Sequence, residues 1–303
     1  IAFGSPDPGE YLSVSTRIVS SWYCRPIDWT NSSYETGSIS NHNPPRTDLP
    51  RLKLFIRERT YVATMSDPVP ALADRASAAA DRLRRADRVL LASHIDADGL
   101  TSAAVATTAL TRAGIPVETV FKKQLDATEI ASLAARDEET VLFTDFGSGQ
   151  LDAISDHVAA GDFEAVIADH HQPADPDDCH PDVVHETDGY ADFDYHCNPL
   201  LVGINGASEL SGAGAAYVLA RALEPDGGDN RDLSALAVVG AVGDMQAVGG
   251  ELVGANSGIV EEGAAADVVT EGTDLSLYGK QTRPLPKLLE YATDVPIPGI
   301  SND

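Results

Sequence analysis

Short apolar runs alternate with helical segments along much of this sequence, and this alternation restricts the fold more than any other feature. Each run is short and strongly apolar, as expected for a buried strand. The predicted strands are 88–93, 117–121, 140–144 and 164–168. The predicted helices are 70–87, 99–113, 127–136, 150–160, 211–223 and 231–247. Strands that alternate with helices pair in parallel. We therefore expect an α/β fold with a doubly wound, mainly parallel sheet.

Acidic residues and histidines gather in four islands, three of which directly follow a predicted strand. The islands are Ser93-His94-Ile95-Asp96-Ala97-Asp98-Gly99, Thr144-Asp145-Phe146-Gly147, Ala168-Asp169-His170-His171-Gln172-Pro173 and Val239-Gly240-Ala241-Val242-Gly243-Asp244. Ligands of open parallel sheets bind beyond the carboxyl ends of the strands. The first three islands fall at that edge, and the fourth joins them if 231–247 approaches it. An extended backbone would place His94, Asp96 and Asp98 on one side, and Gly99 would allow a sharp turn.

The islands together offer up to five carboxylates and three imidazoles. So many anions share a cleft only if cations neutralise them. Oxygen-rich ligands with some histidine suit Mn²⁺ or Mg²⁺ better than a structural zinc, which prefers thiolates. Each residue alone also has a structural explanation: Asp145 or Asp98 as a helix cap, His170 and His171 as polar surface, Asp244 as a solvated loop acid. The ordered set favours a metal centre.

Taken in order, the islands resemble the motif series of the DHH phosphoesterase superfamily. The matching residues are His94, Asp96, Asp98, Gly99, Asp145, Asp169, His170, His171, Gly243 and Asp244. Asn198-Pro199 and Ser211-Gly212-Ala213-Gly214 are similar to the RecJ-like branch, notably the nucleases of archaea. The resemblance covers about 65–300 and implies a Rossmann-like catalytic domain with two divalent cations, usually Mn²⁺.

The resemblance also implies a role for each ligand. One ion would be held by His94, Asp96 and Asp145. The other would be held by Asp98, Asp145, His170 and Asp244, so that Asp145 bridges the two. His171 would face the scissile phosphate and Asp169 would orient a histidine, which makes these two residues the catalytic candidates. Two cations about 3.5–4 Å apart can generate a hydroxide and stabilise charge on the transferring phosphoryl group.

Composition and resemblance divide the chain into three parts. Residues 1–64 carry 7 Lys and Arg against 6 Asp and Glu, whereas 65–303 carry 14 against 41. We hypothesise that Met65 is the natural start and that 1–64 is a non-native or disordered extension; the alternative is an N-terminal arm that binds a partner. Residues 65–260 would form the DHH-type catalytic domain. Residues 261–303 would begin a linker or C-terminal region that is truncated, because the Gly-Gly-His-type motif of a RecJ-like substrate-binding domain does not follow residue 260.

The net charge of −26 argues against a nucleic-acid partner on ordinary grounds, because phosphate binding needs a basic face. High salt offers another explanation, since the Debye length falls to about 3 Å at 1 M and self-repulsion is screened. Only five lysines are present, which fits a salt-loving, haloarchaeal source. No apolar run approaches the roughly 18 residues of a membrane helix, and no signal peptide is visible. We expect a cytoplasmic protein that does not enter a membrane.

The expected function is metal-dependent phosphodiester hydrolysis of single-stranded DNA or RNA from an end, as in a RecJ-like exonuclease of DNA repair or replication. One alternative is a DHH phosphoesterase acting on short oligonucleotides, cyclic dinucleotides or nucleotide phosphates. A second is a non-catalytic replication scaffold, which degenerate metal ligands would mark; here every ligand position is filled. The resemblance implies one further partner, the GINS replication complex, with which archaeal relatives associate.

Three further signals carry less weight. One signal is a possible zinc site, but the spacing of its candidate ligands matches no usual zinc-binding pattern. The candidates are Cys179, His180, His185, His196 and Cys197. The Gly-rich stretch 205–214 opens a helix and suits either a phosphate cradle or close helix packing. The pair Lys122 and Lys123 suits either a nucleic-acid backbone or a solvated strand end.

Overall fold

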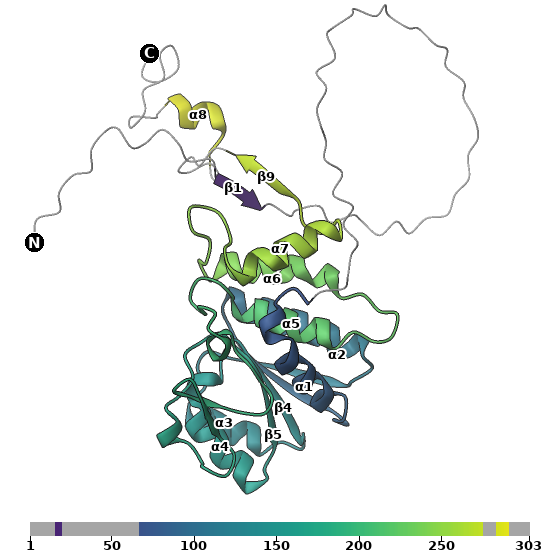
Figure 1. Cartoon of the computed structure of the whole chain (residues 1–303), viewed down its shortest axis with the longest axis vertical. Coiled ribbons are helices and arrows are strands. Elements are labelled where there is room, and N and C mark those ends of the chain that lie inside the picture. Colours follow the sequence, from purple (N-terminus) through teal and green to yellow (C-terminus); the bar gives the residue numbers. More distant parts are fainter. Residues whose placement is uncertain (1–15, 20–66, 275–282, 291–303) are drawn as a thin grey trace, which may run out of the picture. The chain divides into compact units, whose positions relative to one another are not determined.

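The computed structural model describes residues 16–19, 67–274 and 283–290. Its main feature is a parallel sheet with helices packed against it (Figure 1). Five strands pair in the order β3-β2-β4-β5-β8, and every neighbouring pair is parallel. The strands are β2 (Val89–His94), β3 (Val117–Lys122), β4 (Thr140–Thr144), β5 (Glu164–Ala168) and β8 (His196–Cys197). The predicted doubly wound α/β fold is confirmed. Strand β8 was not predicted, because two residues are too few to show a pattern.

Helices cover both faces of this sheet. They are α1 (Ala73–Leu83), α2 (Ala97–Arg112), α3 (Ala127–Ala134), α4 (Leu151–Ala160), α5 (Gly212–Ala222), α6 (Ser234–Gly243) and α7 (Ala255–Ala265). Successive strand residues point to opposite faces, so Leu90 and Val141 pack with α3 and α4, whereas Leu91 and Leu142 pack with α1, α2 and α5. Burial on both faces explains why the strands are almost continuously apolar.

The strand order reverses between β2 and β4. The chain leaves β2 through α2 to reach β3 on one side, and returns through α3 to β4 on the other side. Connections that leave in opposite directions open a crevice beyond the carboxyl ends of the two strands, which is where ligands bind in sheets of this kind. His94 is the last residue of β2 and Asp145 directly follows β4, so both islands lie at this crevice.

The helices after β8 stack on the α2 side of the sheet (Figure 1). A Cβ on Gly243, at the end of α6, would lie 2.7 Å from Cβ of Ala97, at the start of α2. A Cβ on Gly240, one turn earlier in α6, would lie 2.5 Å from Oγ1 of Thr101 in the next turn of α2. The two helices are therefore antiparallel, and the end of α6 returns to the crevice. The predicted helix 231–247 stops at Gly243, which leaves Asp244 as its C-cap residue.

The remaining elements are short. They are β1 (Thr16–Val19), β6 (His185–Thr187), β7 (Tyr190–Asp192), β9 (Glu271–Asp274) and α8 (Leu285–Glu290). β1 pairs with β9, and β6 with β7, both antiparallel. Most of 1–64 and part of 261–303 lie outside the described residues, so the domain boundaries proposed there stay predictions. Among the described residues, none of the helices has the length and apolar character needed to cross a bilayer.

Candidate metal centre

The first island bends into a helix instead of continuing as an extended strand. Asp96 is the N-cap of α2 and accepts a 2.9 Å hydrogen bond from the N–H of Gly99, and Asp98 lies in the first helical turn. The expectation of an extended backbone is therefore wrong, although the fold still brings His94, Asp96 and Asp98 to the crevice. Gly99 is needed for close approach, since a Cβ there would lie 2.3 Å from the carbonyl oxygen of His94.

Asp145 occupies a strained backbone position at the end of β4. Its φ of +58° lies in the left-handed region, which costs a non-glycine residue about 1–3 kcal/mol. The side chain is 1% exposed, and neither carboxylate oxygen has a hydrogen-bond partner. Oδ2 lies 3.6 Å from Nδ1 of His94, and Oδ1 lies 3.3 Å from Nε2 of His170. Burial raises the pKa of Asp145 to about 8. Because the carboxylate accepts no N–H, it is not a helix cap.

His170 presents one ring nitrogen to these carboxylates. Its Nδ1 lies 2.7 Å from the carbonyl oxygen of Gly206, which can only accept, so Nδ1 donates and the neutral ring carries its lone pair on Nε2. Nε2 lies 3.3 Å from Oδ1 of Asp145 and 3.7 Å from Oδ2 of Asp98, and has no hydrogen-bond partner. Burial acts to lower the pKa of His170, but Asp145 and Asp169 raise it to about 10. The surrounding carboxylates therefore favour a positive charge at Nε2 of His170.

The start of α5 holds Asp98 in place. Oδ2 of Asp98 accepts the N–H of Gly212 at 2.7 Å, and Oδ1 accepts the N–H of Ala213 at 2.9 Å. Burial raises the pKa of Asp98. Since these N–H groups already bind a carboxylate, the Gly-rich stretch suits close packing better than a phosphate cradle. A Cβ on Gly212 would lie 2.5 Å from Oδ1 of Asp145, and one on Gly240 would lie 2.4 Å from Oδ1 of Asp98. These glycines leave room for the two carboxylates.

Asp244 approaches the same cluster from the end of α6. Its Oδ2 lies 3.8 Å from Nδ1 of His170 and accepts a 2.9 Å hydrogen bond from Nε2 of Gln246. Nε2 of Gln246 also lies 2.8 Å from the Gly206 carbonyl oxygen. Its Oε1 accepts a 2.7 Å bond from Nδ2 of Asn256. The buried Gln246 amide therefore links Asp244 to the loop that orients His170. Sequence reasoning missed Gln246, because a single amide after a helix carries no pattern.

Asp169 contacts the second histidine of the third island. Its Oδ1 accepts a 2.8 Å hydrogen bond from Nδ1 of His171, and its Oδ2 accepts the N–H of Ser148 at 3.0 Å. Burial acts to raise the pKa of Asp169, but the bond from His171 and the charges of both histidines hold it well below its ordinary range. The same bond raises the pKa of His171, whose side chain is 54% exposed. This contact orients the exposed ring of His171.

Within the described residues, three overlapping groups of side chains have ligand atoms within 4.8 Å of one another. The groups are His94, Asp96 and Asp145; Asp98, His170 and Asp244; and Asp145, Asp169, His170 and His171. They include every site residue predicted from the sequence. Buried polar atoms normally have a partner, so both oxygens of Asp145 and Nε2 of His170 stand out as atoms without one. Oxygen and imidazole ligands of this kind fit divalent cations such as Mn²⁺ and Mg²⁺.

The described cysteines do not contribute to these groups. Cys179 and Cys197 are buried free thiols, and burial raises the pKa of Cys179 to about 11 and that of Cys197 to about 12. Protonated thiols are poor metal ligands. Of the lysine pair, Lys122 forms an ion pair with Glu129, and the side chain of Lys123 is exposed. Neither the two cysteines nor the lysine side chains therefore add a ligand to the centre, although the carbonyl oxygen of Lys123 lies 3.1 Å from Nε2 of His94.

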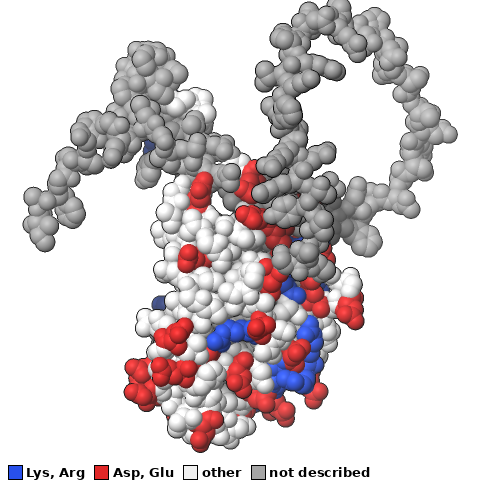
Figure 2. Space-filling model, in the orientation of Figure 1, with Lys and Arg blue, Asp and Glu red and all other residues white. Residues whose placement is uncertain are grey.

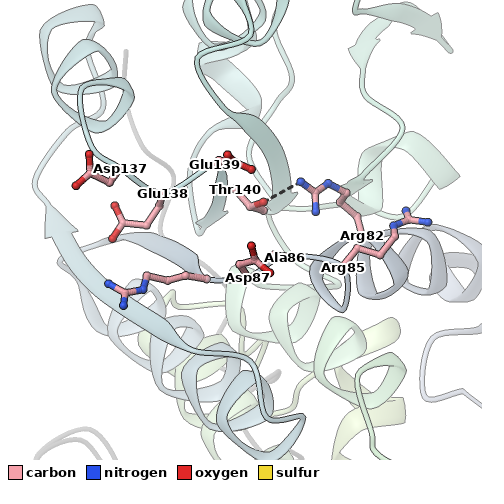
Figure 3. Close-up of a pocket in the computed structure, with 9 residues that line it drawn as sticks. Arg82, Arg85, Ala86, Asp87, Asp137, Glu138, Glu139 and Thr140 are labelled. Atoms are coloured by element: carbon pink, nitrogen blue, oxygen red, sulfur yellow. Dashed lines mark hydrogen bonds between the residues drawn. The ribbon is translucent and has the colours of Figure 1, made fainter.

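A hollow of about 260 Å³ lies at the opposite edge of the sheet (Figure 3). Arginines at the end of α1 and acidic residues before β4 line it, together with Ala86 and Thr140. The charged lining residues are Arg82, Arg85, Asp87, Arg88, Asp137, Glu138 and Glu139. Arg82 donates a 2.8 Å bond to Oγ1 of Thr140. The hollow has charges of both signs and lies at the amino ends of the strands, whereas ligands of parallel sheets bind beyond the carboxyl ends.

Comparison with protein families assigns the domain that carries this cluster. A family model described as "DHH family, N-terminal domain" matches residues 88–241, which is half of the chain. The chain belongs to the DHH family. The matched region contains every predicted ligand except Asp244. A second model, described as "DHH-CID domain", matches residues 277–303.

Relatives of this DHH-family chain are longer than the region they share with it. A protein of Methanocaldococcus jannaschii, described as uncharacterized, is 29% identical over 214 residues, which cover 70% of this chain and 44% of that protein. RecJ of Thermus thermophilus in complex with Mn²⁺ is 24% identical with a TM-score of 0.48, over 65% of this chain and 27% of RecJ. An exonuclease RecJ bound to manganese is 23% identical with a TM-score of 0.49, over 65% of this chain and 48% of that structure. The matches cover less than half of each relative.

Family membership and the ligand cluster point to the same chemistry. The DHH domain contains the carboxylates and imidazoles that come together at the crevice, and those groups suit divalent cations. Together they support a metal-dependent phosphoesterase.

Proposed function

We propose that this chain is a two-metal phosphodiesterase that shortens single-stranded nucleic acid from an end. One observation carries the two-metal part of the proposal: the buried carboxylate of Asp145 directs one oxygen toward His94 and the other toward His170, and neither oxygen has a hydrogen-bond partner. A carboxylate in this position suits a bridge between two cations. The RecJ-like motif series of the sequence is the reason to choose single-stranded nucleic acid as the substrate.

The ligand groups divide between two cation positions. His94, Asp96 and Asp145 would hold one ion, and Asp98, Asp145, His170 and Asp244 would hold the other. When bound, divalent cations lower the pKa of water and neutralise the charge of phosphate oxygens. The chain supplies the positions of these ligands: α2 begins at the first group, and the N–H groups at the start of α5 fix both oxygens of Asp98.

His171 is the side chain we assign to the scissile phosphate. Nδ1 of His171 donates a hydrogen bond to Asp169, so Nε2 is the ring nitrogen left for the substrate. Asp169 also raises the pKa of His171, which favours the charged imidazolium that a phosphate oxygen or a leaving oxygen needs. The ring is half exposed while Asp169 is fully buried. This arrangement allows a substrate to reach His171 without reaching Asp169.

The acidic net charge of the chain requires the hydrolysis assay to be run at high salt. On the face shown in Figure 2, acidic side chains are spread over the described surface, and Lys and Arg gather in one area. A chain with a net charge of −26 repels a polyanion at low salt. Repulsion over distances beyond about 3 Å is screened at 1 M salt. A salt-loving source, which we infer from the composition, therefore reconciles the acidic chain with a nucleic-acid substrate.

The test is hydrolysis by the full chain with Mn²⁺ in molar KCl. The substrates are end-labelled single-stranded DNA, single-stranded RNA and a dinucleotide, and Asp145→Asn serves as a variant of equal shape without the bridging charge. Stepwise shortening of the long strands by the wild type, abolished in Asp145→Asn, is the expected result. Cleavage of the dinucleotide alone would assign the chain to the small-substrate phosphoesterases. Wild-type activity in Asp145→Asn would contradict the bridging role.

The scaffold alternative receives no support from the residues present, since each predicted ligand keeps a carboxylate or an imidazole. Association with a GINS complex stays a prediction of the RecJ-like resemblance. It would be tested by co-purification in high salt, with Asp145→Asn expected to retain the partner, because a docking role does not need the metal ligands.

A further inference from the structure

A buried polar network lies directly behind His171 and Asp169. The hydroxyl of Ser148, in the first turn after β4, lies 2.9 Å from Nε2 of His196, the first residue of β8. One N–H of the Asn198 amide donates to the same hydroxyl at 2.9 Å, and the amide also donates to the carbonyl oxygen of His171 at 2.9 Å. Ser148, His196 and Asn198 are each fully buried. None of these residues belongs to a metal-ligand group.

A buried acid, Asp192, lies near the network on the far side of His196. Nδ1 of His196 lies 3.4 Å from Oδ1 of Asp192. Asp192 accepts two hydrogen bonds from Arg75, at 2.7 and 3.0 Å. The residue types therefore resemble a Ser-His-Asp triad. Ser148 is nevertheless 0% exposed, so no substrate reaches its hydroxyl. The network therefore cannot supply a nucleophile, and any function it has must act through the residues that it contacts.

The donors of the network have one consistent assignment. The Asn198 amide uses its two hydrogens on Ser148 and on the carbonyl of His171, so the serine hydroxyl accepts from Asn198 and still has its own proton to donate. Nε2 of His196 is the acceptor available to it. Nδ1 of His196 lies 3.4 Å from Oδ1 of Asp192 and has no hydrogen-bond partner. The hydrogens of Ser148 and Asn198 therefore each have a direction, which restricts the movement of these two side chains.

The main chain of Ser148 connects this network to the proposed catalytic pair. Its N–H donates to Oδ2 of Asp169 at 3.0 Å, while Oδ1 of Asp169 binds Nδ1 of His171 at 2.8 Å. The side chain of Ser148 is held by His196 and Asn198, so the position of its N–H is held as well. Asn198 additionally holds the carbonyl of His171. The loops that follow β4, β5 and β8 are thus tied together at Asp169.

We propose that Ser148, His196 and Asn198 are positioning residues for His171: they fix the Asp169 carboxylate and, through it, the direction of the His171 ring. The inference rests on the proposed function, in which His171 meets the scissile phosphate. It predicts that loss of the Ser148 hydroxyl affects the catalytic step and leaves metal binding intact, because the network touches Asp169 and not the atoms of Asp145 or His170 that lack partners.

The first arm of the test does not depend on activity. In the metal-free full chain, the Nδ1 proton of His171, hydrogen-bonded to Asp169, should give a downfield proton resonance that is assigned by its loss in His171→Gln. We expect Ser148→Ala to broaden this resonance through faster exchange with water. Ser155→Ala is the matched control, since Ser155 is an equally buried serine whose hydroxyl bonds main-chain groups of Asp152 and His180 and not the Asp169 network. An unchanged resonance in Ser148→Ala, or equal broadening in both variants, would overturn the proposal.

The second arm measures hydrolysis and Mn²⁺ affinity in the same variants. Loss of an outer-shell partner typically costs about 10–100-fold, and we expect this loss in kcat for Ser148→Ala, with KM and Mn²⁺ affinity changed by less than about twofold. His196→Gln, which keeps an acceptor for the Ser148 hydroxyl, should recover part of the kcat that His196→Phe loses. A loss confined to KM or to Mn²⁺ affinity would contradict positioning. If the wild type hydrolyses no substrate, the proposed function fails, and the resonance still decides the network.

Discussion

Gly212→Ala should disable the metal centre through one methyl group. Gly212 is the first residue of α5, and its N–H binds Asp98 while its Cα faces Asp145. An added Cβ would lie 2.5 Å from Oδ1, 2.9 Å from Cβ and 3.0 Å from Cγ of Asp145. The backbone of Gly212 is not in the left-handed region, so alanine is allowed there, and in a helix it is favoured over glycine by up to about 1 kcal/mol. The collision is therefore the main effect.

The size of the effect follows from the distances. Oδ1 must retreat by about 0.9 Å to reach the 3.4 Å of ordinary contact. Rotation of the side chain cannot relieve the contact with Cβ of Asp145, so the strained backbone at φ +58° must also move. A displacement of about 1 Å at a catalytic group can cost 100-fold in rate, or roughly 2.7 kcal/mol of transition-state stabilisation. We expect kcat/KM and Mn²⁺ affinity to fall together, because the proposed function assigns Asp145 to both cation positions.

Gly214→Ala, two residues further along α5, provides the control. Its Cβ would lie 2.5 Å from Cδ1 of Leu210, an equal overlap against a methyl group instead of a ligand. Overpacking of this kind costs about 1–3 kcal/mol of stability and should leave Mn²⁺ affinity unchanged. Calorimetric Mn²⁺ titration and hydrolysis of labelled single-stranded DNA measure both variants. Wild-type affinity and rate in Gly212→Ala, or an equal loss in Gly214→Ala, would refute the reasoning.

Three further predictions concern stability. Above about pH 8, where the buried carboxyl group of Asp145 is ionised, Asp145→Asn should raise the melting temperature in EDTA, because it removes a charge that no hydrogen-bond donor stabilises. Mn²⁺ should then no longer stabilise the variant, and a lower melting temperature in EDTA would argue against this account. Arg75→Gln should destabilise the chain by about 3 kcal/mol at pH 7, because it breaks a buried ion pair. Burial acts to raise the pKa of Asp192, but His196 and Arg75 hold it below the ordinary value of 3.8, so the contribution of this pair is present above that value and is lost as the pH falls. Urea unfolding at pH 7 and pH 3 measures it, and an equal loss at both values would contradict the assignment. The melting temperature should rise between about 0.1 and 1 M KCl as screening reduces the repulsion of the net charge of −26, and a falling value would count against a salt-loving source.

The sequence by itself was enough to predict the sheet and the edge of it at which the candidate ligands come together. Apolar runs and helical segments are local patterns that identify the strands. Because parallel strands have their carboxyl ends at one edge of the sheet, residues that follow the strands are expected to meet at that edge. His94, Asp145 and His170 each follow a strand at that edge, so their meeting at the crevice was predictable. The spacing of His94, Asp96 and Asp98 was misinterpreted, because a helix N-cap at Asp96 replaced the extended backbone.

The tertiary structure decided the features that depend on contacts between distant segments. The antiparallel packing of α6 on α2 returns Asp244 to the crevice, and the start of α5 holds Asp98 across 114 positions of sequence. Gln246 and Ser148 showed no periodicity or spacing that could have identified them. Asn198 and Gly212 lie in stretches that resemble RecJ-like proteins, but the resemblance did not indicate which groups they contact. The candidate ligands could be recognised from the local sequence. The groups that orient them come from distant segments, and only the packing of the helices brings those segments next to the ligands.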